Sequence, residues 1–192
     1  EQGLARGPEF TVETIAGVIR TYIVNHSSRV TMVKVDMGEP VLHREHIPML
    51  GGKGYALDES ISIEGKMFHY SAVNVGVPHA VVYVNDLDKT DVGYWGPRIE
   101  TNRLFPKHIN VDFTQIMDRK TLRVRTWERG VGETLSCGTG CAAAMLAAFL
   151  THKTQPEVDV ALKLGSLHIE FNGSNIFMTG PAESIFVGQA SL

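Results

Sequence analysis

A thiol and a charged pair lie close together in the second half of this sequence. Cys137 is followed by Gly138-Thr139-Gly140, and Glu128-Arg129 comes shortly before it. Residues 141–150 are almost all Ala, Met, Leu and Phe, which predicts a helix that is apolar on every side and therefore buried. Cys137 would stand at the start of that helix, where backbone N–H groups lack intrahelical partners and the dipole is positive. This position favours a thiolate or a bound carboxylate.

Packing offers a simpler interpretation of the same residues. A single cysteine at a helix start is often a small buried hydrophobe, and glycine is common in turns. We prefer the chemical interpretation because two glycines flank Thr139 and a charged pair precedes it, and packing alone requires none of these. Cys141 lies one turn deeper in the same helix, so we expect it to pack rather than to act as a base.

Short alternating strands account for most of the remaining sequence and predict an α+β fold of mostly antiparallel strands. The predicted strands are residues 10–14, 17–24, 29–36, 61–64, 67–75, 109–116, 122–127, 158–164, 167–171 and 176–179. A second helix is predicted at residues 92–104, ending before Pro106. In the strand at 109–116, Ile109, Val111 and Phe113 face one way, while Asn110 and Asp112 face the other.

Two further polar groups come from the loops. Gly76 and Pro78 interrupt an apolar strand, which suggests a bulge that presents the next residue, His79. A loop carries His43, Glu45 and His46, but their spacing does not match a helical metal-binding motif. We therefore expect a solvated loop and no metal.

Composition narrows the class of protein. The chain has 192 residues, 43% of them hydrophobic and 20% charged, which is ordinary for a globular protein. With a net charge of −3, the chain lacks the positive charge typical of proteins that bind nucleic acid or an anionic membrane surface. We see no signal peptide and no membrane span. The two cysteines are too close together in the sequence for a disulfide between them to cross-link distant parts of the fold. Free thiols predict a cytoplasmic protein.

Several motifs resemble those of the diaminopimelate epimerase family. The segments at 128–134 and 137–140 are similar to its second catalytic motif, and Phe105 to Val111 is similar to its FP-x-x-x-NV pattern. Gly76 to His79 resembles its GNPH motif, with Val77 in place of the family's Asn, a position that helps to hold the far end of the substrate. The resemblance covers essentially the whole chain.

The resemblance implies two pseudo-symmetric domains, each with mostly antiparallel strands around a buried central helix. Residues 1–37 would be the remainder of the N-terminal domain, 38–181 the complete C-terminal domain, and 182–192 a return to the N-terminal domain. The family's first catalytic-cysteine segment, a CGNG-type motif, is absent from the sequence. The chain therefore resembles an epimerase that starts mid-domain, whose missing half carries the second cysteine.

The resemblance also implies the reaction: cofactor-independent epimerisation of LL- to meso-diaminopimelate by two cysteines, a step in lysine and peptidoglycan precursor biosynthesis. Cys137 would be one of the two acid–base groups. The other roles implied are N–H donation to the substrate by Gly138 and Thr139, proton tuning and ammonium binding by Glu128, pairing of the distal carboxylate by Arg129, a pocket position for Asn110, and orientation of a thiol by His79. A homodimer is also implied, as is an enzyme without cofactor.

Three alternatives stay open. Val77 leaves room for a racemase of the same fold that acts on another amino acid, such as histidine or glutamate. The segment Gly138 to Ala143 fits the dinucleotide-binding pattern G-x-G-x-x-A, followed at a suitable distance by Asp159. That motif requires a parallel βαβ unit, whereas the flanks predict antiparallel hairpins. The third alternative is an inactive fragment, since one half-site is missing.

Overall fold

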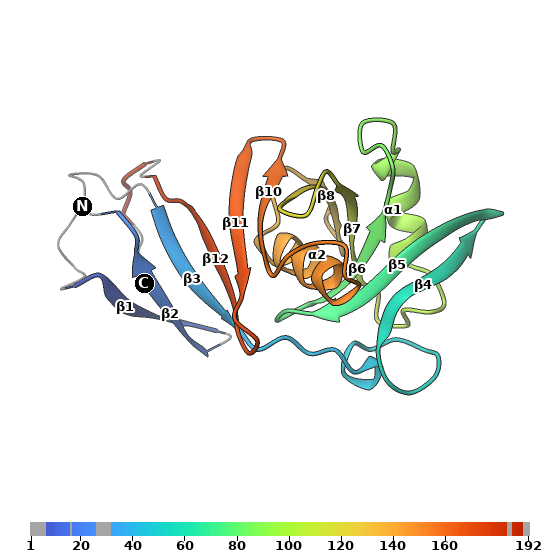
Figure 1. Ribbon diagram of the computed structural model, residues 1–192, viewed down its shortest axis with the longest axis horizontal. Helices are drawn as coiled ribbons and strands as arrows, with labels where there is room; N and C mark the ends of the chain where they lie inside the picture. The colour runs from blue at the N-terminus through green and yellow to red at the C-terminus, as the bar shows by residue number, and fades with distance from the viewer. Residues whose placement is uncertain (1–6, 16, 26–31, 184–185, 190–192) are drawn as a thin grey trace.

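The computed structural model describes residues 7–15, 17–25, 32–183 and 186–189 (Figure 1). Within these residues, twelve strands form one sheet, accompanied by two α-helices and a short 3₁₀ turn. The strands are β1 (Glu9–Thr14), β2 (Gly17–Ile23), β3 (Met32–Gly38), β4 (Ala56–Ile63), β5 (Lys66–Asn74), β6 (Pro78–Tyr83), β7 (Asn110–Ile116), β8 (Thr121–Glu128), β9 (Gly132–Thr134), β10 (Glu157–Leu162), β11 (Gly165–Phe171) and β12 (Ile176–Pro181). The helices are η1 (Arg44–His46), α1 (Val92–Glu100) and α2 (Gly138–Leu150).

Helix α2 is the centre of the larger part of the molecule. The sheet runs in the order β1-β2-β3-β12-β11-β10-β8-β7-β6-β5-β4, with β9 paired to β8, and the strands from β12 to β5 surround the helix (Figure 1). Every residue from Gly140 to Ala148 is buried, which confirms the prediction of a helix that is apolar on all sides. The sheet thus holds the start of α2 in a fixed place.

The strand pairing confirms the predicted hairpins but is not wholly antiparallel. Strands β6 and β7 are parallel, and so are β8 and β10. Helix α2 lies in the chain between β8 and β10, so a parallel β-α-β connection does exist around it. Our expectation of purely antiparallel flanks was wrong there, because local alternation does not report which distant strand becomes the neighbour.

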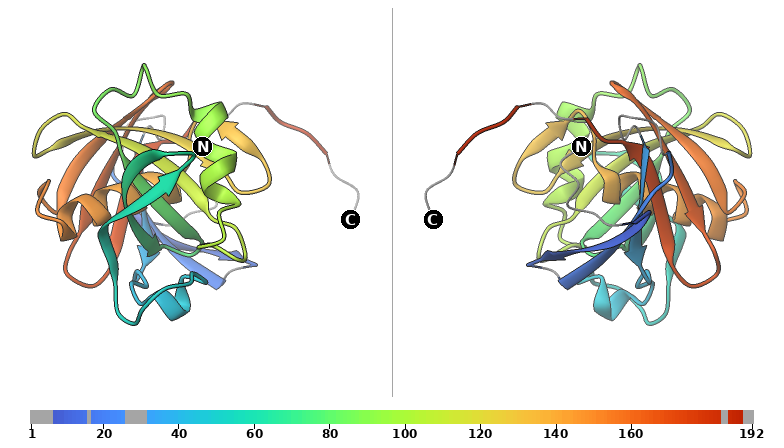
Figure 2. Two further views of the ribbon diagram at one scale, coloured as in Figure 1. Left: turned by 90° about the vertical axis from the view of Figure 1, so that its right-hand side faces the viewer. Right: turned by 90° about the vertical axis from the view of Figure 1, so that its left-hand side faces the viewer.

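Strand β3 joins the chain's first strands to its last. It pairs with β2 on one side and with β12 on the other, along six positions with β12. Strands β1 and β2 extend the sheet away from α2 (Figures 1 and 2). Their apolar side chains include Val18, which is 69% exposed. The predicted boundary at residues 37–38 falls at the end of β3, but the division into domains stays a prediction.

Helix α1 covers the outer side of β7 and β8 and ends earlier than predicted. Its last residue is Glu100 rather than Leu104. Thr101 caps the helix. Its backbone N–H and its hydroxyl both donate to the carbonyl oxygen of Pro97. The Asn102 side chain then accepts the N–H of Leu104 in a local turn. Side-chain bonds to nearby backbone compete with continuation of the helix. Glu100 is consequently the last helical residue, facing β8.

Among the described residues, no helix combines the length and apolar character needed to cross a bilayer. The same part of the chain contains no group of His, Cys, Asp or Glu side chains arranged to hold a metal ion. In the loop considered above, the ring of His43 packs edge-on against Tyr55 at 4.8 Å between centroids.

Candidate active site

Cys137 is the N-cap residue of α2. Its extended backbone, with φ −137° and ψ 108°, brings the chain into the helix, and its Sγ accepts the N–H of Gly140 at 3.4 Å. The hydroxyl of Thr139 lies 3.4 Å from the same sulfur. Only 9% of the residue is exposed. The thiol therefore stands at the helix start, as predicted, among the free N–H groups of the first turn.

Burial raises the pKa of the Cys137 thiol above its ordinary value. The Thr139 hydroxyl and the Gly140 N–H favour the thiolate, but the negative charges of Asp112 and Glu128 oppose it. Burial and these two charges therefore favour the thiol form of Cys137 over the thiolate. A protonated thiol is a proton donor.

Cys141 is fully buried inside α2, and burial raises the pKa of its thiol strongly. A thiol without access to solvent or ligand, and with no tendency to ionise, is a packing residue. The role expected for Cys141 from its place in the sequence agrees with this environment.

A buried polar network lies beneath the start of α2. His79 Nδ1 donates to Asp112 Oδ2 at 2.7 Å, and Thr126 Oγ1 donates to Asp112 Oδ1 at 2.8 Å. His79 and Asp112 are completely buried. The other ring nitrogen of the histidine, Nε2, is buried and has no partner among the described residues. One nitrogen is thus held by a carboxylate, while the other remains available to a group that the described residues do not supply.

The predicted bulge at His79 was wrong. Gly76, with φ +98°, forms the turn between β5 and β6, and the strands pair from Asn74 and Pro78 onward. His79 is a regular residue of β6, opposite Asn110 of the parallel strand β7. It reaches its partner because parallel pairing brings the start of β6 to the start of β7, which the sequence pattern did not indicate.

Packing requires the second of the two glycines around Thr139. A Cβ at Gly140 would overlap Asp112 Oδ1 and lie 2.9 Å from Thr126 Oγ1, and a Cβ at Gly138 would lie 2.8 Å from Met178 Sδ. Our premise that packing requires neither glycine was therefore wrong for Gly140. The absence of a side chain at Gly140 is what lets the buried carboxylate sit directly under the helix start.

Replacement of Gly140 by alanine is expected to destabilise the fold by about 1–3 kcal/mol, because the new methyl group displaces Asp112 from its two hydrogen bonds. Gly138→Ala is the matched control. It meets only the end of the flexible Met178 side chain, which can move aside. Urea unfolding monitored by circular dichroism measures both. Equal losses for the two variants would contradict the explanation.

The charged pair lies at the turn between β8 and β9. Glu128 Oε1 accepts the hydroxyl of Thr134 at 2.6 Å. The N–H of Arg129 donates to Asn110 Oδ1 at 2.8 Å, and Asn110 Nδ2 donates to Pro78 O at 3.1 Å. Asn110 is therefore buried between the ends of three strands. The exposed Arg129 guanidinium donates to Lys107 O and forms no ion pair with a described carboxylate.

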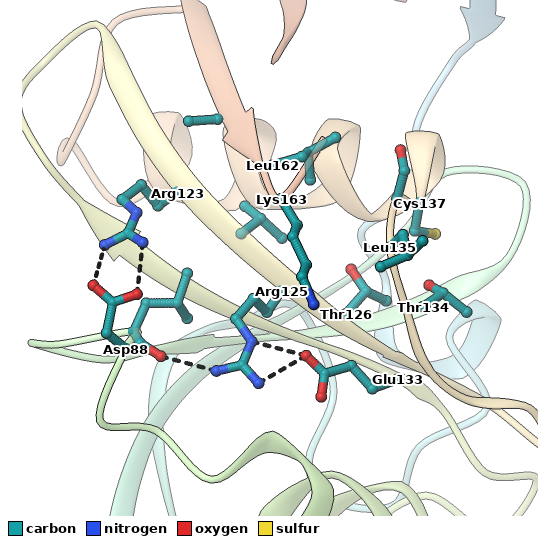
Figure 3. A pocket seen from close by; sticks show the side chains of 14 residues that line it. Asp88, Arg123, Arg125, Thr126, Glu133, Thr134, Leu135, Cys137, Leu162 and Lys163 are labelled. Atoms are coloured by element: carbon teal, nitrogen blue, oxygen red, sulfur yellow. Dashed lines mark hydrogen bonds and ion pairs between the residues drawn. The ribbon is translucent and has the colours of Figure 1, made fainter. Parts of the chain in front are cut away.

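A hollow of about 480 Å³ opens between β8, β9 and the end of β10 (Figure 3). Cys137 lies at one end of it. Along its walls, Arg123 pairs with Asp88 and Arg125 pairs with Glu133. His79, Asn110, Glu128 and Arg129 do not line it. The predicted site residues therefore gather at the helix start and the neighbouring turn, while the hollow reaches the thiol from the side of β8, β9 and β10.

The sequence missed Asp112 and Thr126. A signal was present for the first: Asp112 is a carboxylate between two apolar residues of a predicted buried strand. A buried carboxylate requires hydrogen-bond donors, so its position could have indicated a polar network. Thr126 offered no comparable signal, because threonine is common in strands.

Comparison with known proteins identifies the family. A family model described as diaminopimelate epimerase matches residues 71–185. The diaminopimelate epimerase of Moorella thermoacetica is 44% identical over 194 residues, covering 100% of this chain and 70% of the relative. That of Pelotomaculum thermopropionicum is 43% identical, covering 98% and 68%. The chain belongs to the diaminopimelate epimerase family. Membership confirms the resemblance of the motifs and places the chain among the amino-acid epimerases, which are isomerases.

Solved structures agree on the fold. A probable proline racemase from Agrobacterium radiobacter superposes with a TM-score of 0.69 at 18% identity, covering 96% of this chain and 61% of the racemase. A hydroxyproline epimerase from Agrobacterium vitis gives 0.63 at 18% identity, covering 91% and 57%. The chain thus spans less than two thirds of these two proteins. The neighbours confirm the α+β architecture of this epimerase family member.

The dinucleotide-binding alternative requires a parallel β-α-β connection, which the structure contains. It also requires glycines that make room for a phosphate, and these glycines face other groups. In this epimerase family member, Gly138 and Gly140 make room for Met178 and Asp112, not for a pyrophosphate. A buried carboxylate directly beneath the helix start also disfavours a phosphate there.

Proposed function

We propose that this chain supplies one half of the active site of a diaminopimelate epimerase, which interconverts LL- and meso-diaminopimelate without a cofactor. The observation that carries the proposal is the Cys137 thiol at the start of the buried helix α2, where its sulfur accepts the N–H of Gly140, in a chain with 44% identity to a diaminopimelate epimerase. Such an enzyme would serve lysine and peptidoglycan precursor biosynthesis.

The proposed chemistry is proton transfer at the α-carbon of the substrate. An amino-acid α-proton is a weak acid, so its removal needs fixed dipoles that stabilise the negative charge developing on the α-carboxylate. The free N–H groups of Gly138 and Thr139 supply such dipoles. A base on the opposite face takes the α-proton, the electrons of the C–H bond move into the carboxylate system, and the Cys137 thiol donates its proton to the near face. In the reverse direction, the Cys137 thiolate is the base.

The turn after β8 would hold the rest of the substrate. Glu128 Oε2 has no partner among the described residues and is available to an ammonium group. The Arg129 guanidinium suits the distal carboxylate, because its planar fork binds a carboxylate with two parallel hydrogen bonds. Asn110 fixes the backbone of Arg129 by accepting its N–H.

The opposite acid–base group must come from outside the described site. The sequence contains only two cysteines, and Cys141 lies buried in the same helix as Cys137. We propose that a segment with the family's first catalytic cysteine provides it, and that the unpartnered Nε2 of His79 orients that second thiol. The exposed apolar side chains of β1 and β2, such as Val18, give that segment a surface to cover. A cytoplasmic homodimer is part of the same proposal.

The test uses this chain fused to the first-cysteine segment of the Moorella thermoacetica relative, here named the completed protein. Incubation with LL- or meso-diaminopimelate in deuterated water should give isomerisation and α-deuterium incorporation. This chain without the added segment should be poorly soluble and inactive, because it has one acid–base group and the apolar side chains of β1 and β2 are uncovered. No exchange with either isomer by the completed protein would refute the proposal, and activity of the chain alone would refute the need for a second cysteine.

A racemase for another amino acid is the second candidate, favoured by one observation. Val77, partly exposed in the turn before His79, replaces an amide that could hold the distal end of diaminopimelate. Glutamate and histidine therefore form parallel arms of the exchange experiment. Faster exchange on either of them than on diaminopimelate would select this candidate.

A further inference from the structure

We propose that Glu100, the last residue of α1, is a positioning residue that fixes the substrate-binding turn at Glu128–Gly130. The inference rests on the function proposed above for that turn. Glu100 touches no reacting group itself. It acts by holding the Trp127 side chain before Arg129 and the backbone N–H of Gly130 after it.

Both oxygens of the Glu100 carboxylate accept hydrogen bonds from residues at the turn. Oε2 accepts the indole N–H of Trp127 at 2.7 Å, and Oε1 accepts the backbone N–H of Gly130 at 3.0 Å. His108 Nδ1 lies 3.3 Å from Oε1. The residue is only 7% exposed. A buried carboxylate with charge-assisted bonds to two sides of one turn is a strong anchor.

Glu100 is itself held in place, because α1 packs tightly on β8. Helix α1 packs so closely on β8 that a Cβ at Gly96 would lie 2.5 Å from the Trp127 ring. The bond from the indole to Glu100 is formed across this contact. The end of α1, the Trp127 ring and the start of the turn therefore form one packed unit.

The turn needs anchors from outside because its own backbone is permissive. Gly130 has φ +73° and Gly132 has φ +115°, conformations that glycine adopts without strain and leaves easily. Asn110 holds the N–H of Arg129 from one side, and Glu100 holds Gly130 from the other. These bonds determine where the Arg129 side chain begins.

Glu128 is fixed separately. Its carboxylate is held by Thr134 of β9, and it is the last residue of the regular strand β8. Loss of the Glu100 bonds should therefore displace Arg129 more than Glu128. In catalytic terms, binding of the distal carboxylate should weaken while proton transfer at the α-carbon continues.

The first experiment compares Glu100→Gln with Glu64→Gln in the completed protein. Glutamine keeps the size of the side chain, but its NH₂ group must face one of the two N–H donors. Glu64 is the matched control, because this exposed carboxylate binds Tyr94 and Arg98 of the same helix without touching the turn. For Glu100→Gln, KM for diaminopimelate should rise about tenfold while kcat stays within about twofold. A fall in kcat with unchanged KM, or equal effects of the two variants, would overturn the inference.

The second experiment needs no substrate. Trypsin can cleave after Arg129 only when the turn leaves its place, so cleavage of the Arg129–Gly130 bond reports its mobility. Mass spectrometry should show faster cleavage there in Glu100→Gln than in Glu64→Gln, in the completed protein. Unchanged cleavage would overturn the role of Glu100 even if the completed protein is active. Faster cleavage in a protein inactive on diaminopimelate would support the positioning role and refute the proposed function alone.

A second variant guards against a folding failure of Glu100→Gln. Trp127→Phe removes only the indole N–H and keeps an aromatic ring against Gly96. It should raise both KM and the cleavage rate, by less than Glu100→Gln, since the bond from Gly130 to Glu100 remains. If Trp127→Phe behaves like wild type in both measurements, the proposal fails.

Discussion

Replacement of Cys137 by serine in the completed protein is expected to lower epimerisation of diaminopimelate by about a thousandfold or more. A serine hydroxyl occupies the same N-cap position, so the helix should start normally. Its pKa is far above that of a thiol, and it neither donates its proton to a carbanion nor takes one from the α-carbon at useful rates. The rate of α-deuterium incorporation, measured separately from LL- and from meso-diaminopimelate, checks the effect in each direction.

Cys141→Ala is the matched control for this prediction. It removes the other thiol of the chain from the same helix, where the group is buried and makes no contact with the proposed substrate site. Activity should stay near that of the unmodified protein. Near-normal turnover by Cys137→Ser, or equal losses in the two variants, would remove Cys137 from the mechanism and leave it as an N-cap.

Replacement of Asp112 by alanine is expected to destabilise the fold by about 3–5 kcal/mol. Asp112 is completely buried and accepts hydrogen bonds from His79 and Thr126. Without it, both donors remain in the interior with no acceptor, beneath the start of α2. Each unsatisfied buried group costs free energy that the remaining packing cannot recover. The free energy of unfolding from urea denaturation of the completed protein checks the magnitude.

The chain contains a natural control for this effect. Asp159 also binds a histidine, with His168 Nδ1 at 2.8 Å, but its side chain is 68% exposed. In Asp159→Ala, water replaces the lost partner, so the loss of stability should be much smaller. A similar loss in both variants would show that burial is not the source of the effect at Asp112.

The sequence by itself determined the features that depend on local pattern. A run of small and apolar residues after Cys137 specified a buried helix, since no face of it is suited to water. Alternation and turn residues specified the hairpins β10–β11 and β11–β12. The predicted strand 158–164 runs two residues past the end of β10 at Leu162, into the turn before β11. The motifs around Cys137 and Glu128 pointed to the family, because they are long and their glycines and charges fall at fixed spacing.

The tertiary structure alone decided what surrounds those residues. His79 and Asp112 are 33 residues apart, and Glu100 and Trp127 are 27 apart, so no local pattern relates them. Parallel pairing of β6 with β7 and the close approach of α1 to β8 bring each pair together. The protonation state of Cys137 was likewise undecided by sequence. A helix start favours a thiolate, but strands from distant parts of the chain bury the sulfur beside two carboxylates, and the cost of desolvation outweighs the N–H groups of a single turn.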